Sequence, residues 1–204
     1  MPNSSCMDRK FVERVSAKDM FPLFESIRKS LVHYFASHLV TYPSAGNMLA
    51  GKCGVFVTYR DGKGNVRGSM GLLDTDRPLY QSAIDCAISA VKDDPRYERI
   101  IINDVNSISI EITLIDNIWE ITNNFESASK MYKPGTHGFY VETDILAGVL
   151  LPREIVNEKI NSFNSAIERL NSKCNLPSGK GARYHMFSSR VFLQTAAGSE
   201  VIEL

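Results

Sequence analysis

The sequence lacks net charge, long apolar runs and paired cysteine motifs. Its 204 residues carry 23 lysines and arginines against 23 aspartates and glutamates, a formal net charge of zero. This balance gives no electrostatic reason to expect a nucleic-acid partner. The longest apolar run, Ile145 to Leu151, is far too short to cross a bilayer. We therefore expect a protein with neither a membrane nor a nucleic acid as its partner.

Cysteine is scarce, and its spacing excludes the common metal and redox motifs. None of the four cysteines forms a C-x-x-C pair or lies at metal-ligand spacing from a histidine. We predict free thiols, with Cys86 as a small core residue inside a helical pattern. The residues identify no metal site and name no cofactor. The first residues are not a secretory signal pattern, so we predict a cytoplasmic protein.

One stretch resembles a phosphate-binding loop but lacks its context. Gly46, Gly51 and Lys52 have the spacing of that loop, with Cys53 in place of serine or threonine. Such a loop must leave a strand and open a helix, so that the helix N-terminus faces phosphate. Here an extended run follows instead, so we reject a nucleotide site.

Hydrophobic periodicity predicts alternating helices and hairpins. In the first helix, Asp19 is the predicted N-cap, and Phe21 lies on the predicted apolar stripe. Paired hairpins with interposed helices indicate an α+β fold, with largely antiparallel sheets and flanking helices. Helices are predicted over 17–38, 76–92, 123–131 and 152–172, and strands over 53–60, 66–72, 108–114, 139–142, 145–151 and 183–195, with 200–204 as an edge strand or a frayed end.

The order strand, strand, helix, strand occurs twice along the chain. We hypothesise an internal duplication of ββαβ units, although the two halves share no obvious sequence identity. We predict one domain over residues 1–204, with a possible subdivision near 117–137 and a flexible N-terminus over 1–16. The sequence does not specify an oligomeric state.

The most specialised stretch runs from Val66 to Gly71 at the end of the first hairpin. Arg67 offers a fixed charge and several donors, suited to a carboxylate or phosphate; the alternative is an ion pair with Asp74 or Glu111. Gly68 and Gly71 weaken a strand, which marks a bulge or a close backbone approach. We expect them mainly to let the backbone turn, and alternatively to present N–H groups to an anion.

Three further side chains are candidates for catalysis. His137, between Gly135 and Gly138 on a predicted connection, could act as a general acid or base, or could hold the loop by hydrogen bonds. Glu111, on the polar side of a core strand, could be a base, an arginine partner or simply solvent-facing. With Ser69 these residues would make a triad-like set, although the sequence shows no nucleophile elbow.

Six spaced motifs resemble the AMMECR family, also named AmmeMemoRadiSam system protein A. The likeness extends in order from about residue 20 to 195. One departure concerns Ser69, which stands where the family usually has cysteine, so a reaction that needs a thiolate would be impaired here. The motifs are Gly54-Val55-Phe56-Val57-Thr58, Val66-Arg67-Gly68-Ser69-Met70-Gly71, Asp94-Pro95-Arg96-Tyr97, Glu111-Ile112-Thr113-Leu114, Gly135-Thr136-His137-Gly138 and Leu150-Leu151-Pro152.

The resemblance implies an α+β fold in two closely associated parts, with the hallmark residues near a cleft. It implies no settled activity. In many prokaryotes such proteins are encoded beside a Memo-like protein and a radical-SAM enzyme, which suggests a shared small-molecule pathway. Two hypotheses follow: a small-molecule enzyme or accessory subunit with an anion-binding cleft near Arg67, Glu111 and His137, or a non-catalytic regulatory module for a protein or RNA.

Overall fold

The computed structural model describes residues 9–43, 49–176 and 181–204. Residues 1–8 of the predicted flexible N-terminus, Cys6 and Gly46 of the phosphate-loop-like stretch lie outside these ranges. The helices are α1 (Arg9–Arg14), α2 (Ala17–Ser37), α3 (Leu79–Lys92), the 3-10 helix η2 (Ile102–Asp104), α4 (Phe125–Met131), α5 (Pro152–Asn157) and α6 (Phe163–Lys173). The strands are β1 (Val55–Arg60), β2 (Val66–Leu72), β3 (Ser109–Glu120), β4 (His137–Glu142), β5 (Ala147–Leu150), β6 (Arg183–Gln194) and β7 (Val201–Glu203).

Hydrogen bonds join the strands in one sheet, in the order β2-β1-β3-β6-β4-β5 with β7 beside β6. The pairs β1–β2, β1–β3, β4–β5, β4–β6 and β6–β7 are all antiparallel. The predicted α+β class is therefore confirmed, with a single sheet. Residues 200–204 contribute the short strand β7, which resolves the alternative left open for them. Among the described residues, no helix is both long and apolar enough to span a bilayer.

The chain divides into two compact units. Unit 1 comprises Met1–Asp116 and Arg190–Leu204, and unit 2 comprises Asn117–Ser189. Strands β3 and β6 each contribute residues to both units. Each unit has its own apolar cluster, and each is described by itself below.

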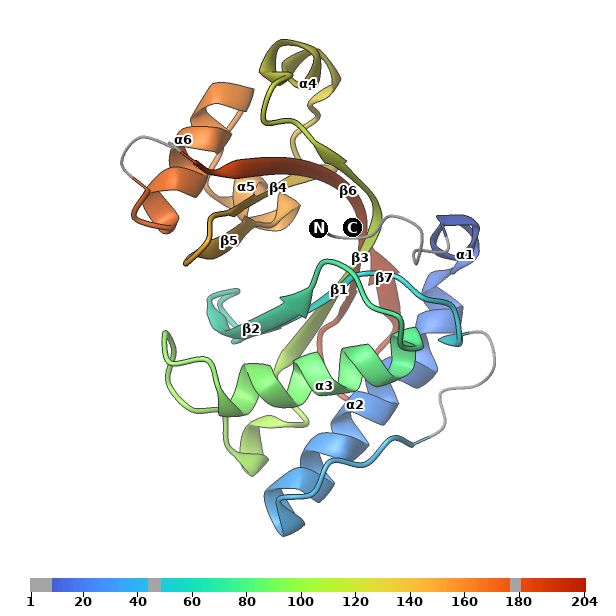
Figure 1. Ribbon diagram of the computed structural model, residues 1–204. Helices are drawn as coiled ribbons and strands as arrows, with labels where there is room; N and C mark the ends of the chain where they lie inside the picture. The colour runs from blue at the N-terminus through green and yellow to red at the C-terminus, as the bar shows by residue number, and fades with distance from the viewer. Residues whose placement is uncertain (1–8, 44–48, 177–180) are drawn as a thin grey trace. The chain divides into compact units, whose positions relative to one another are not determined.

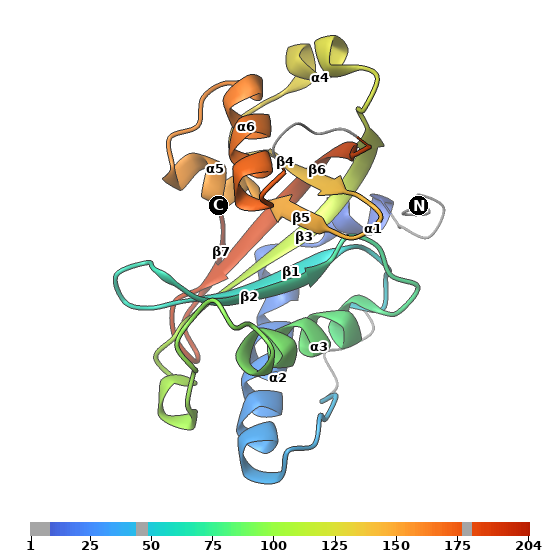
Figure 2. The same ribbon diagram turned by 60° about the vertical axis from the view of Figure 1, so that its left-hand side comes forward.

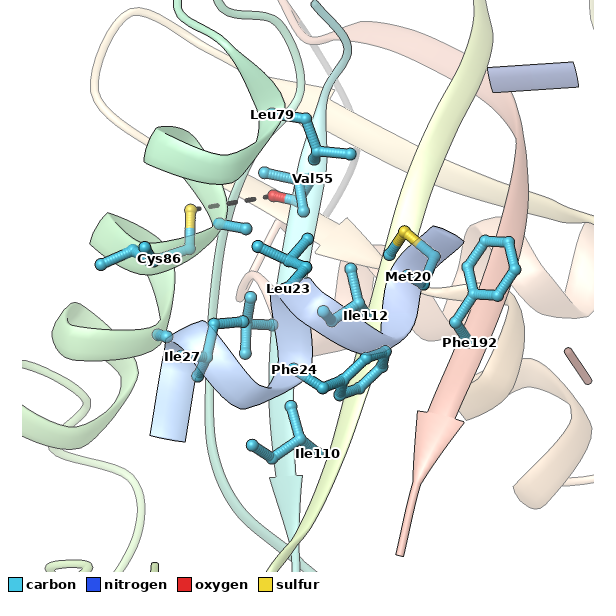
Figure 3. Packing of buried hydrophobic residues seen from close by; sticks show 14 of the residues in the cluster. Met20, Leu23, Phe24, Ile27, Val55, Leu79, Cys86, Ile110, Ile112 and Phe192 are labelled. Carbon is cyan, nitrogen blue, oxygen red and sulfur yellow. Dashed lines mark hydrogen bonds between the residues drawn. The ribbon is translucent and has the colours of Figure 1, made fainter. Parts of the chain in front are cut away.

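The core of unit 1 lies between two helices and one face of the sheet. Alternation along β1 and β3 directs Val55, Val57, Ile110 and Ile112 to this face, as the sequence predicts. Figure 1 shows α2 (blue) and α3 (green) beside these strands. The packing is drawn in Figure 3, where Met20, Leu23, Phe24 and Ile27 of α2 lie against side chains of β1, β3 and β6.

Cys86 belongs to this core, as predicted. It is 4% exposed, and its Sγ donates to the Val55 carbonyl oxygen over 3.9 Å (Figure 3). Burial raises the pKa of the thiol to about 12, because a thiolate would lose its hydration there. The side chain is a free thiol that behaves as a small apolar residue.

Two details of the predicted α2 helix are wrong. Ser16, rather than Asp19, is the N-cap; the Ser16 hydroxyl accepts from the Asp19 backbone, and the Asp19 carboxylate accepts from the Ser16 N–H at 2.9 Å. This is a capping box, in which the side chain of the third helical residue accepts from the backbone N–H of the N-cap residue. Phe21, predicted on the buried stripe, is 37% exposed, whereas Phe24, predicted on the same stripe, is buried together with Leu23.

Unit 2 corrects another prediction, the long helix over 152–172. The chain forms two helices there, α5 and α6, seen beside β4 and β5 in Figure 2. Lys159 adopts a left-handed φ of 56°, which ends the helical path. Ser162 then starts α6 by accepting from the Ser165 N–H at 3.1 Å. Val156 continues the apolar spacing across this break, which is why the sequence predicts one long helix, but its side chain is half exposed.

Strand pairing inside the two units follows one pattern. In unit 1, β1 lies between β2 and β3, and in unit 2, β4 lies between β5 and β6. In each case the first strand of the hairpin is the central one, and the helical segment precedes the third strand. This agreement supports the duplication hypothesis, which superposition of the two ββαβ segments would test.

Candidate functional site

The candidate site of unit 1 is built on a β-bulge in β2. Tyr59 pairs with Gly68, but the next residue, Arg60, pairs with Val66. Arg67 is therefore the extra residue on β2. A bulge bends its strand and re-aims a side chain, which gives Arg67 a direction that regular alternation does not predict.

Gly68 and Gly71 let neighbouring groups approach the backbone of β2 closely, whereas the prediction that they mainly let the backbone turn is wrong. Neither has a positive φ, and both lie inside β2. A Cβ on Gly68 would come within 2.5 Å of the Ala90 carbonyl oxygen of α3. A Cβ on Gly71 would come within 2.1 Å of the Phe56 ring. The two glycines therefore let β2 pack against a helix on one side and an aromatic ring on the other.

Ser69 is tied to its surroundings by three hydrogen bonds. Its Oγ lies 2.8 Å from Thr58 Oγ1, on the neighbouring strand. Its backbone N–H donates to Asp94 Oδ2 at 2.9 Å, and its carbonyl accepts from Arg96 Nη2 at 3.0 Å. The hydroxyl thus contacts another hydroxyl and not a base, so these contacts do not activate it as a nucleophile.

Asp94 and Arg96 form the local charge pair that reaches Ser69. Arg96 Nε lies 2.8 Å from Asp94 Oδ1, and the Asp94 side chain is 1% exposed. Burial raises the pKa of this carboxyl, but hydrogen bonds from Arg96 and from the Ser69 backbone outweigh burial and leave the pKa below its usual value. The carboxylate is therefore charged at neutral pH.

Glu111 is completely buried, so its solvent-facing alternative is wrong. Arg60 Nε donates to Glu111 Oε2 at 2.9 Å, and Arg60 Nη2 reaches Glu111 Oε1 at 3.4 Å. The arginine partner is thus Arg60 rather than Arg67. Glu111, Thr58 and Ser69 are direct cross-strand neighbours on β3, β1 and β2, and therefore share one side of the sheet.

Arg67 is half-buried and makes few contacts. Its Nη2 reaches the Arg99 carbonyl oxygen over 3.4 Å, a long hydrogen bond. Its Nε is buried and has no hydrogen-bond partner, and Arg67 forms no ion pair among the residues that the structure describes. The guanidinium therefore keeps donors and a net charge that an anion could use.

His137 belongs to unit 2, where it starts β4. Its Nδ1 accepts from the Lys133 backbone N–H at 2.9 Å, and the backbone N–H of His137 donates to the Lys133 carbonyl at 3.0 Å. Gly135, at φ 84°, makes this tight turn possible. Burial, and then the charge of Lys133, lower the pKa of the imidazole. The loop-holding role is confirmed, and a catalytic role stays a prediction.

The described contacts therefore engage each member of the predicted triad separately. Ser69 contacts Thr58, Glu111 contacts Arg60, and His137 contacts Lys133. Sequence reasoning missed Arg60 and Thr58, which alternation along the strand 53–60 could have indicated, because both lie on the side opposite the apolar core. Within the described ranges, no three His, Cys, Asp or Glu side chains are grouped to hold a metal ion.

Comparison with known proteins gives consistent matches over most of the chain. The family model described as AMMECR1 matches residues 24–192. A protein of Methanosarcina acetivorans is 31% identical over 157 residues, which cover 74% of this chain and 76% of that protein. A protein of Caldivirga maquilingensis is 23% identical over 187 residues, covering 86% and 85%.

A solved structure has the same fold. The crystal structure of PH0010 from Pyrococcus horikoshii superposes with a TM-score of 0.83 and covers 93% of this chain and 98% of its own. Sequence identity in this match is 21%, so it shows the fold alone.

Proposed function

The chain belongs to the AMMECR1 family, as its motifs predicted, and on this premise we propose that it binds a small anionic metabolite through Arg67. The protein would act as a small-molecule enzyme or as the accessory subunit of one. The observation that carries this proposal is the buried, unpartnered Nε of a guanidinium that has no carboxylate partner among the described residues.

The contrast with two other arginines of unit 1 supports this choice. Arg60 is neutralised by Glu111, and Arg96 by Asp94. Arg67 lies on the same strand as Ser69 but keeps its charge uncompensated. A guanidinium offers two parallel donors to a carboxylate or phosphate, which is the geometry that such anions prefer.

A thermal-shift screen tests the proposal. Wild-type protein would be screened against phosphate monoesters and small carboxylates, together with Arg67→Gln and, as a control, Arg14→Gln, an exposed residue of α1. A ligand at about 100 times its dissociation constant stabilises the native state by about 2.7 kcal/mol. We expect an anion that stabilises the wild type and the control but not Arg67→Gln.

The rival function is a regulatory binding module without a small ligand. It would gain support if no anion stabilised the wild type while one protein or RNA was recovered with it at fixed stoichiometry. The partners that the resemblance implies, a Memo-like protein and a radical-SAM enzyme, stay predictions. Co-purification with each, in the presence and absence of the stabilising anion, is the direct test of their involvement.

The roles of Ser69, Glu111 and His137 in catalysis, and of the Gly68 and Gly71 backbone in anion binding, stay predictions as well. Ser69→Cys restores the residue that the family usually has. A nucleophilic role predicts a large change in turnover of the identified metabolite. A purely structural role predicts unchanged turnover and a stability change within about 1 kcal/mol.

A further inference from the structure

Two aromatic side chains of unit 2 lie beside one imidazole. The ring centroids of Trp119 and His137 lie 6.0 Å apart with the planes at 73°, and those of Tyr132 and His137 lie 6.5 Å apart at 34°. Trp119 comes from β3, Tyr132 follows α4 and His137 starts β4. All three belong to unit 2, whereas Arg67 belongs to unit 1.

Two of these side chains carry unused hydrogen-bonding groups. Because His137 Nδ1 accepts from Lys133, the proton of the neutral ring is on Nε2, which is then a donor. Nε2 has no acceptor among the residues that the structure describes. The Tyr132 hydroxyl oxygen is buried and has no hydrogen-bond partner. Buried polar groups in native proteins are usually paired, so the Tyr132 hydroxyl calls for an acceptor, and the Nε2 donor of His137 could serve the same one.

The rings differ from the core aromatics beside them. Phe139 and Phe163 are almost fully buried in the apolar cluster of unit 2, whereas Trp119 and Tyr132 are only partly buried at its margin. Amphipathic rings at a margin offer stacking area together with polar tips. The exposed Lys133, which immediately follows Tyr132, acts on the imidazole with a positive charge. The local field therefore favours an anion.

We propose that Trp119, Tyr132 and His137 form a second ligand site, which takes a planar aromatic carboxylate. The ligand ring stacks against the aromatic side chains. The carboxylate accepts hydrogen bonds from His137 Nε2 and from the Tyr132 hydroxyl, and Lys133 supplies the attracting charge. This proposal does not rest on the Arg67 site, since the residues belong to different units.

The intrinsic fluorescence of the chain reports on this site directly, because Trp119 is the only tryptophan. Wild-type protein would be titrated with benzoate, with its neutral analogue benzamide, and with cyclohexanecarboxylate, which has the charge but no planar ring. We expect a saturable change with benzoate and clearly weaker binding of both analogues. A linear, unsaturable response to benzoate would overturn the proposal.

Two mild variants identify the residues that bind. Tyr132→Phe removes only the hydroxyl and is expected to weaken benzoate binding about tenfold, the loss of one charge-assisted hydrogen bond. Lys133→Gln, at an exposed position, is expected to weaken benzoate but not benzamide. Arg14→Gln, an exposed charge outside both sites, should bind benzoate as the wild type does. Wild-type affinity in both Tyr132→Phe and Lys133→Gln, or loss of binding in Arg14→Gln, would contradict the assigned site.

Discussion

The carboxylate of Asp94 accepts the backbone N–H of Ser69 at 2.9 Å, on the side of β2 where none of the described residues forms a neighbouring strand. Arg96 completes the arrangement by donating to the carbonyl of Ser69. Unpaired edge strands are prone to intermolecular pairing, and proteins cover them with side chains or loops. Asp94 and Arg96 thus act on β2 as a partner strand would, at the residue next to the Arg67–Gly68 bulge.

Asp94→Ala is expected to lower the free energy of unfolding by about 1–3 kcal/mol, because it removes the carboxylate that accepts from the Ser69 backbone N–H and pairs with Arg96. The measurement is urea denaturation followed by circular dichroism. Asp93→Ala, at a position with a 46% exposed side chain, is the control and should change stability by less than about 0.5 kcal/mol. Equal effects of the two substitutions would contradict the role of Asp94.

The buried Arg60–Glu111 pair gives a second prediction. Removing one partner takes this ion pair away from a buried charge, so Glu111→Leu and Arg60→Met should each lower the free energy of unfolding by about 3–5 kcal/mol. The double variant Arg60→Met/Glu111→Leu removes both charges and should be distinctly more stable than either single variant. Denaturant midpoints of the wild type, the two single variants and the double variant complete the double-mutant cycle. Strictly additive losses would show that the pair is not coupled.

The close approach of α3 to Gly68 in β2 gives a third prediction. Gly68→Ala is expected to destabilise the protein by about 1–3 kcal/mol, because the added methyl would meet the backbone carbonyl of Ala90 in α3. Gly62→Ala is the matched control, since nothing lies within 4 Å of its added Cβ. Thermal unfolding compares the two variants. If Gly68→Ala were as stable as Gly62→Ala, α3 would accommodate the added methyl group without loss of stability, and the prediction would be wrong.

The histidine of unit 2 gives a pH-dependent prediction. Burial and Lys133 lower the pKa of His137 below its unfolded value of 6.5, so the unfolded state binds the proton more readily. The stability that the neutral ring contributes is present above about pH 6.5 and is lost as the pH falls towards the folded pKa. Burial also lowers the pKa of His185, so His185 contributes to the same pH dependence of stability.

His137→Gln should therefore reduce, without abolishing, the loss of stability between about pH 7.5 and pH 5.5. Unfolding free energies at several pH values measure the slope, and His33→Gln, on the exposed side of α2, is the control. The same slope in wild type and His137→Gln would show that this ring is not held in its neutral form.

Much of the fold followed from local pattern. The first hairpin was predicted within two residues of the ends of β1 and β2, because the residues between the two strands are typical of a turn. The structure has a turn at Asp61–Asn65, where the Asp61 carboxylate accepts from the backbone N–H groups of Lys63 and Asn65. The break between α5 and α6 was missed, since a left-handed Lys159 leaves no sequence signal as strong as a glycine. Strand β3 also continues past residue 114 to Glu120, through the polar Asp116 and Asn117.

For the candidate site, residue types were predictable and partners were not. Arg67 and Glu111 were both singled out, but Glu111 forms its ion pair with Arg60, its diagonal neighbour on β1. The bulge at Arg67 lies next to Gly68, where β2 closely approaches Ala90 of α3, and no local sequence pattern records either feature. Burial of Glu111 likewise arises from tertiary packing, because a polar residue that alternates with isoleucines ordinarily faces water.

The anion site that we propose depends above all on Arg67. Isothermal titration of the most stabilising anion into wild type, Arg67→Gln and Arg14→Gln is the decisive measurement. We expect affinity to fall at least about tenfold in Arg67→Gln alone, the loss of about 1.4 kcal/mol or more of charge-assisted hydrogen bonding. Equal affinity in all three proteins would show that Arg67 does not bind the anion.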